Sequence, residues 1–175
     1  MPGVAATLSD RVPPNALVCV APNAASGHPT SAVVRDPEAP KITISVPDGW
    51  SSSAGTGDIA LATTGPDGMS ATVTIAATEL DPGGSFLRYT ADLGASMPRL
   101  KFAVTGAQFC GYSSQRLSGT LQGQPGAIDF ADRIAHIWTN TKKYLVAIHL
   151  EGPAGRAGFD AAKSTLMQDF GVVIP

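Results

Sequence analysis

The stretch IDFADRIAHIWTNTKKYLVAIHL, residues 128–150, decides the fold of this chain. It holds two runs rich in β-branched and aromatic residues, 128–139 and 144–150, which the polar turn Asn140-Thr141-Lys142 separates. Two such runs joined by a short polar turn are typical of a β-hairpin. Because hairpin strands are antiparallel, this stretch favours an antiparallel sheet over the parallel sheet of a doubly wound fold.

Further strands are predicted on both sides of this hairpin. Ile42, Ile44 and Val46 alternate with polar residues, which is the period-2 pattern of a strand. The sequence Gly65-Pro66-Asp67-Gly68 is typical of a hairpin turn. The other segments with strand character are 59–64, 69–80, 100–109 and 115–121, with 172–174 as a last edge strand. The pattern therefore predicts about seven strands, most of them linked by hairpins.

Two helices interrupt the strands. Asp81-Pro82 is typical of a helix start, with an N-cap residue and proline at the first helical position, and Pro98 ends that helix. A second helix is predicted over 156–170. The residues on the inner faces of the two helices are Phe86, Tyr89, Leu93 and Met97 in the first, and Phe159, Ala162, Leu166 and Phe170 in the second. We therefore predict an α+β fold, in which two main helices flank a central antiparallel sheet of about six to seven strands.

The chain divides into an arm and one domain. Its 175 residues are enough for one domain. Residues 1–40 hold seven of the fourteen prolines, a density that excludes a long helix. We interpret 1–40 as a Pro-rich arm that wraps the domain and carries one short strand at Leu17–Val20, with a disordered linker as the alternative. Residues 41–175 form the single α+β domain.

Composition excludes several classes of protein. Hydrophobic residues make up 43% of the chain, charged residues make up 15%, and the net charge is −2. This balance argues against a nucleic-acid partner held by bulk positive charge. No apolar run reaches the roughly 18 residues that a membrane span needs. We expect no transmembrane segment and a monomer.

Cys19 and Cys110 are the two cysteines, 91 positions apart. This spacing excludes a CxxC redox motif and a cysteine-based zinc cluster. One alternative is a structural disulfide that joins the arm to the middle of the domain, which would stabilise the fold by about 4–5 kcal/mol on the chain-entropy model. The other alternative is two unrelated buried thiols.

The sequence holds no motif that assigns catalysis. A P-loop, HExxH and GxSxG are all absent, and the GxGxxA match at residues 55–60 precedes a strand instead of a helix. His136 and His149 lie on adjacent predicted strands and could approach each other, but a third metal ligand is not evident. We expect no metal, no cofactor and no enzymatic activity. The alternative is a hydrolase whose Ser/His/Asp site uses one of these histidines.

Large contact residues supply the candidate binding site. The general expectation for such side chains is the core. The functional alternative is an apolar cleft between a helix and the sheet. The candidate lining residues are Trp50, Phe86, Tyr89, Met97 and Trp138.

Short segments along the domain resemble the LpqN-type envelope proteins of mycobacteria. Residues 42–50, ITISVPDGW, are similar to the family's opening strand followed by P-x-G-W. The later segments that agree in order are 69–82, 116–120 (RLSGT), 143–148 (KYLVAI) and 170–173 (FGVV). The resemblance covers about residues 41–174.

This resemblance implies a PsbP-like α/β/α sandwich, export with a signal peptide removed, and a non-enzymatic role in the cell envelope. The implied role is a binding or scaffold module for a lipid, a glycolipid or a protein partner, or a structural domain of a larger envelope protein. Val18 precedes Cys19 where a lipobox needs a small residue. The cysteine pair departs from the family pattern and suggests a soluble branch that a disulfide stabilises.

Overall fold

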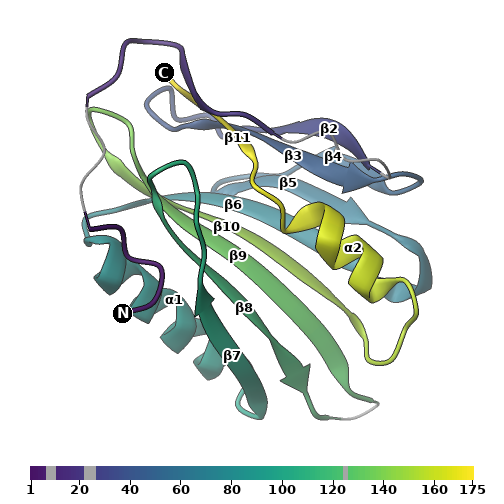
Figure 1. Cartoon of the computed structure of the whole chain (residues 1–175). Coiled ribbons are helices and arrows are strands. Elements are labelled where there is room, and N and C mark those ends of the chain that lie inside the picture. The colour runs from purple at the N-terminus through teal and green to yellow at the C-terminus, as the bar shows by residue number, and fades with distance from the viewer. Residues whose placement is uncertain (7–10, 22–26, 124–125) are drawn as a thin grey trace.

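The computed structural model describes residues 1–6, 11–21, 27–123 and 126–175. Two antiparallel sheets and two α-helices form the fold, which confirms the predicted α+β class (Figure 1). Helix α1 lies on one face of the larger sheet, and the smaller sheet and helix α2 lie on the other (Figure 1). Within the described residues, no helix has the length and apolar character needed to cross a membrane.

The larger sheet has seven strands in the order β4-β5-β6-β10-β9-β8-β7. Its strands are β4 (Ser51–Ala54), β5 (Ile59–Thr64), β6 (Ser70–Thr78), β7 (Leu100–Gly106), β8 (Ser113–Leu121), β9 (Ile128–Trp138) and β10 (Lys143–Pro153). The hairpin predicted at residues 128–150 is β9–β10, paired from Trp138–Lys143 to Ile128–Pro153. It lies at the centre of the sheet because β8 and β6 add to its two sides.

A second sheet has four strands in the order β1-β11-β3-β2. Its strands are β1 (Ala16–Cys19), β2 (Gly27–Ala32), β3 (Lys41–Pro47) and β11 (Gly171–Ile174). Two predicted strands, at 42–46 and 172–174, thus belong to this sheet instead of the central one. The short strand predicted at 17–20 is found as β1. Strand β2 contains Pro29 and is an edge strand, where proline is tolerated.

The helices are α1 (Pro82–Ser96) and α2 (Phe159–Leu166). Asp81 caps α1 as predicted, because its carboxylate accepts a hydrogen bond from the Gly84 amide at 2.7 Å. Helix α2 ends before the predicted residue 170, since the chain turns into β11 at Gly171. The Phe170 ring packs instead on Phe109, with 4.3 Å between ring centroids.

Two hydrophobic cores lie on opposite faces of the larger sheet. Side chains alternate along a strand, so neighbouring residues of β9 enter different cores. Phe130 and Ile134 pack with Phe86 and Leu93 of α1 in the smaller core. Ile137 belongs to the larger core, which the second sheet and α2 cover.

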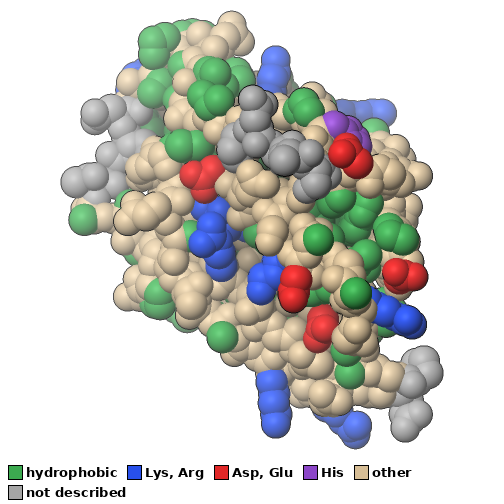
Figure 2. All heavy atoms as spheres, turned by 45° about the vertical axis from the view of Figure 1, so that its right-hand side comes forward, with side chains coloured by type: hydrophobic (Ala, Val, Ile, Leu, Met, Phe, Trp, Pro, Cys, Tyr) green, Lys and Arg blue, Asp and Glu red, His purple; other side chains and the backbone are tan. Residues whose placement is uncertain are grey.

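A disulfide joins Cys19 of β1 to Cys110 in the loop between β7 and β8. This confirms the first of the two cysteine alternatives. Beside it, the fully buried Arg133 donates to the main-chain oxygens of Met167 and Gln108 and to the Asp169 carboxylate. The disulfide and the Arg133 hydrogen bonds therefore link the arm, the loop between β7 and β8, and the segment after α2 to one another. On the face of the molecule in Figure 2, acidic and basic side chains are interspersed.

Candidate ligand groove beneath helix α1

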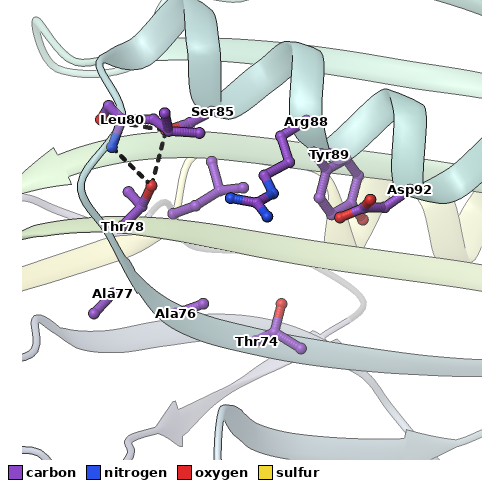
Figure 3. A pocket seen from close by; sticks show the side chains of 10 residues that line it. Thr74, Ala76, Ala77, Thr78, Leu80, Ser85, Arg88, Tyr89 and Asp92 are labelled. Carbon is purple, nitrogen blue, oxygen red and sulfur yellow. Dashed lines mark hydrogen bonds between the residues drawn. The ribbon is translucent and has the colours of Figure 1, made fainter.

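A groove of about 300 Å³ opens between α1 and strands β6 and β10 of the underlying sheet (Figure 3). Its floor includes Thr74 and Ala76 of β6 and Leu145 of β10. Its wall includes Arg88 and Tyr89 of α1. Hydroxyl, charged and apolar groups therefore share one concave surface, which is the mixed lining typical of ligand sites.

The regular spacing of two elements builds this groove. Alternate residues of β6 point toward α1, which brings Thr74, Ala76 and Thr78 to the same side. On α1, Ser85, Arg88, Tyr89 and Asp92 lie three or four residues apart and share one helix face. One end of the groove is closed by a hydrogen bond of 3.1 Å from the Leu80 amide to the Thr78 hydroxyl.

A buried polar cluster supports the wall of the groove at Tyr89. The Tyr89 hydroxyl donates to Oδ2 of Asp132, whose side chain is fully buried. The other carboxylate oxygen, Oδ1, lies 2.7 Å from Nδ1 of His149. On the far side of the imidazole, Nε2 is 3.8 Å from Oε1 of Glu151. Tyr89 is thus anchored to the sheet through Asp132.

The environment of this cluster determines its protonation. Burial by itself lowers the pKa of His149, but the hydrogen bond to Asp132 and the nearby Glu151 carboxylate outweigh burial and raise that pKa to about 10. Burial and the neighbouring Asp132 raise the pKa of Tyr89 well above its usual value. At neutral pH His149 is therefore protonated, and Tyr89 keeps its hydroxyl proton for Asp132. The cluster acts as a fixed charge pair and holds no free base.

The structure separates the five lining residues expected from the sequence. Tyr89 lines the groove. Phe86, only 1% exposed, and Met97 pack in the smaller core under α1. Trp50 is 8% exposed and belongs to the larger core on the opposite face of the sheet. Trp138 is half-buried at the end of β9 and does not line the groove. The five residues therefore do not form one cleft.

The two histidines also lie apart. Both face α1, but the register places His136 opposite Leu145 and His149 opposite Asp132. His136 Nε2 lies 3.0 Å from the main-chain oxygen of Leu80, which is a structural contact. His149, not His136, is the histidine that pairs with Asp132.

Sequence reasoning missed Arg88 and Asp92 as groove residues. The signal was present, because both lie within four residues of Tyr89 on the predicted helix. The group of potential metal ligands found among the described residues is Cys19, Cys110 and Asp169. Its two cysteines are already joined to each other, so this group offers no thiolate to a metal.

The chain is an α+β domain with one helix over a groove of mixed polar and apolar lining, and a solved structure shares its fold. The chain is similar to LpqN, which is involved in cell envelope biogenesis of Mycobacterium tuberculosis: the TM-score is 0.64 and the identity 14%, over 83% of this chain and 91% of LpqN. The chain therefore has an LpqN-like fold, as the sequence resemblance implied.

A Pseudomonas aeruginosa protein of unknown function aligns with a TM-score of 0.44 and 14% identity, over 79% of this chain and 92% of that protein. No protein-family model and no curated protein matches the sequence significantly. The likeness to PsbP stays an expectation of the resemblance.

Proposed function

We propose that this chain is an exported, non-enzymatic binding module of the cell envelope that holds a lipid or glycolipid in the groove beneath α1. LpqN, whose fold it shares, is involved in envelope biogenesis. The Cys19–Cys110 disulfide supports an extracytoplasmic location, since disulfides persist mainly in oxidising compartments. A protein partner that binds at the same groove is the second candidate.

The observation that carries this proposal is the division of the groove lining. Ala76 and Leu145 offer an apolar surface, while Thr74 and Arg88 offer polar groups in the same cavity. An amphiphile would place its chain along the apolar part and its head against the polar part.

The alternative of a hydrolase has weaker support. The Asp132–His149 pair has the form of an orienting acid and a base. However, a pKa of about 10 keeps His149 protonated at neutral pH, so it is poorly suited to accept the proton of a nucleophile. Among the described residues, His149 hydrogen-bonds no serine hydroxyl, and its Nε2 lies 3.8 Å from Oε1 of Glu151. This favours a structural role for the pair.

Native mass spectrometry tests the proposal. The protein would be purified from an actinobacterial host and measured with and without reductant. We expect an oxidised protein that carries a discrete lipid mass. Ala76→Phe, which fills the groove, should remove this adduct. Ala103→Phe, on the exposed side of β7, is the matched control and should keep it.

Two results would contradict the proposal. One is an oxidised, folded protein that binds none of a series of single-chain amphiphiles in titration. The other is an adduct that Ala76→Phe leaves unchanged while circular dichroism shows the native fold, because the ligand would then lie elsewhere.

A further inference from the structure

Two opposite charges line the groove without pairing with each other. Arg88 and Asp92 are one helical turn apart on the face of α1 that lines the cavity. In Figure 3 the Arg88 guanidinium points from the helix into the cavity, and the Asp92 carboxylate lies beside Tyr89. In the part of the chain that the structure describes, neither side chain makes a hydrogen bond or an ion pair within 4.0 Å. Both remain available to a ligand.

The other charged groups around the groove already have partners or other roles. His149 is bound to Asp132 and lies near Glu151, all behind Tyr89. The Lys143 ammonium donates to the main-chain oxygen of Glu79. Asp81 caps the first turn of α1. The charges left to face a ligand are thus one guanidinium and one carboxylate.

We infer that the groove selects a zwitterionic head group, with a phosphate on Arg88 and a primary ammonium on Asp92. This inference rests on the proposed function and names its ligand chemistry. A guanidinium presents a planar fork of donors that matches phosphate oxygens, and a carboxylate accepts from an ammonium. The Thr74 hydroxyl, which points up from β6 in Figure 3, can donate to the phosphate as well.

Charge complementarity sets the order of preference. A head group with only a negative charge would bind Arg88 but would be repelled by Asp92. A head group with only a positive charge would bind Asp92 but would be repelled by Arg88. A neutral sugar head could form hydrogen bonds but would leave both charges uncompensated. The zwitterion therefore gains two charge-assisted contacts where each other head gains one or none.

Isothermal titration calorimetry with chain-matched probes tests this inference, each probe kept below its micelle concentration. The probes are lauroyl lysophosphatidylethanolamine (zwitterionic), lauroyl lysophosphatidylglycerol (anionic), dodecylamine (cationic) and dodecyl maltoside (neutral). Phosphoethanolamine without a chain is a fifth probe, because the same chemistry occurs in a soluble molecule. We expect the zwitterionic lysolipid to bind at least about tenfold more tightly than the other three amphiphiles, the effect of one charge-assisted contact.

Two single substitutions should move the preference in opposite directions. Arg88→Gln should weaken binding of the zwitterionic lysolipid about tenfold and make dodecylamine the better of the singly charged probes. Asp92→Asn should weaken binding of the zwitterionic lysolipid to a similar extent and make lysophosphatidylglycerol the better of the singly charged probes. Arg99→Gln and Asp160→Asn remove matched exposed charges outside the groove and should change neither affinity nor preference.

The outcomes separate the inference from the proposed function. Binding of all four amphiphiles with equal affinity, or variants that do not shift the preference, would overturn the inference while the binding function stands. Failure of every amphiphile to bind would overturn the proposed function. If phosphoethanolamine alone binds as tightly as the lysolipid, the zwitterion site is supported and the lipid part of the proposed function is contradicted.

Discussion

Asp132 and His149 face each other across β9 and β10, with 2.7 Å between Oδ1 and Nδ1. They are cross-strand partners in the central hairpin, so the register of that hairpin creates the pair. The Tyr89 hydroxyl adds a third member from α1. The position of the helix over the sheet therefore depends on a carboxylate buried beneath it.

Removal of this carboxylate should destabilise the fold. Asp132→Ala leaves a protonated His149 and the Tyr89 hydroxyl without their acceptor, and we expect the free energy of unfolding to fall by about 3 kcal/mol. Urea denaturation at neutral pH measures this loss. Asp160→Ala, on the exposed face of α2, is the control and should change stability by less than about 0.5 kcal/mol. A loss below about 1 kcal/mol for Asp132→Ala would show that the pair contributes little.

The raised pKa of His149 predicts a pH dependence of stability. The pKa of His149 in the folded protein is about 10, above the ordinary value of 6.5 for an exposed histidine. Between these values the folded protein retains a proton that the unfolded chain releases, so the stabilisation is complete below pH 6.5 and is lost as the pH rises toward 10. Urea denaturation from pH 6.5 to pH 10 should show this decline, at no more than about 1.4 kcal/mol per pH unit for one proton.

His149→Gln is the reference for that experiment, because glutamine does not titrate. We expect the variant to be less stable than the native protein at pH 6.5 and to show a flatter decline toward pH 10. Identical slopes for the two proteins would assign the pH dependence to other groups.

The disulfide should contribute substantially to stability. Cys19 and Cys110 are 91 positions apart, and on the chain-entropy model a loop of this size stabilises the fold by about 4–5 kcal/mol. Cys19→Ala combined with Cys110→Ala should lower the free energy of unfolding by that amount. Addition of reductant should affect the native protein and leave the double variant unchanged, and a similar response of both proteins would point to a different cause.

Trp50 should support the fold and leave ligand binding unaffected. The ring lies against the backbone of Gly65, where an added Cβ would be only 2.2 Å from the Trp50 ring atom Cε2. We expect Trp50→Ala to cost about 3 kcal/mol of stability, as for other large buried side chains, and to bind amphiphiles normally while folded. Weaker binding with unchanged stability would instead support the sequence-based assignment of Trp50 to the ligand site.

Local patterns were sufficient to predict most elements. Period-2 alternation of Ile42, Ile44 and Val46 located β3, and the Asp81-Pro82 start signal located α1. Strand β4 was missed because Ser51–Ala54 has no apolar alternation and all four of its residues are exposed. The end of α2 was predicted four residues late, because nothing in its helical periodicity indicates that the chain must leave the helix to pair as β11.

The candidate site was harder to predict, since it depends on contacts between distant residues. The sequence places Trp50 and Tyr89 among large contact residues of one kind, yet the structure puts them on opposite faces of the sheet. The face on which a side chain lies depends on strand register, and a shift of one residue exchanges the two faces. The pairing of Asp132 with His149 depended on the same register.

The sequence by itself determined the α+β class, the central hairpin, the start of α1 and the presence of two cysteines able to join the arm to the domain. These features follow from short-range periodicity and turn chemistry, which act within a few residues along the chain. Only the tertiary structure decided that β3 and β11 leave the central sheet, that the cysteines pair, and that Arg88, Tyr89 and Asp92 line one groove. Those outcomes depend on how distant segments pack against one another, and no local pattern records that packing.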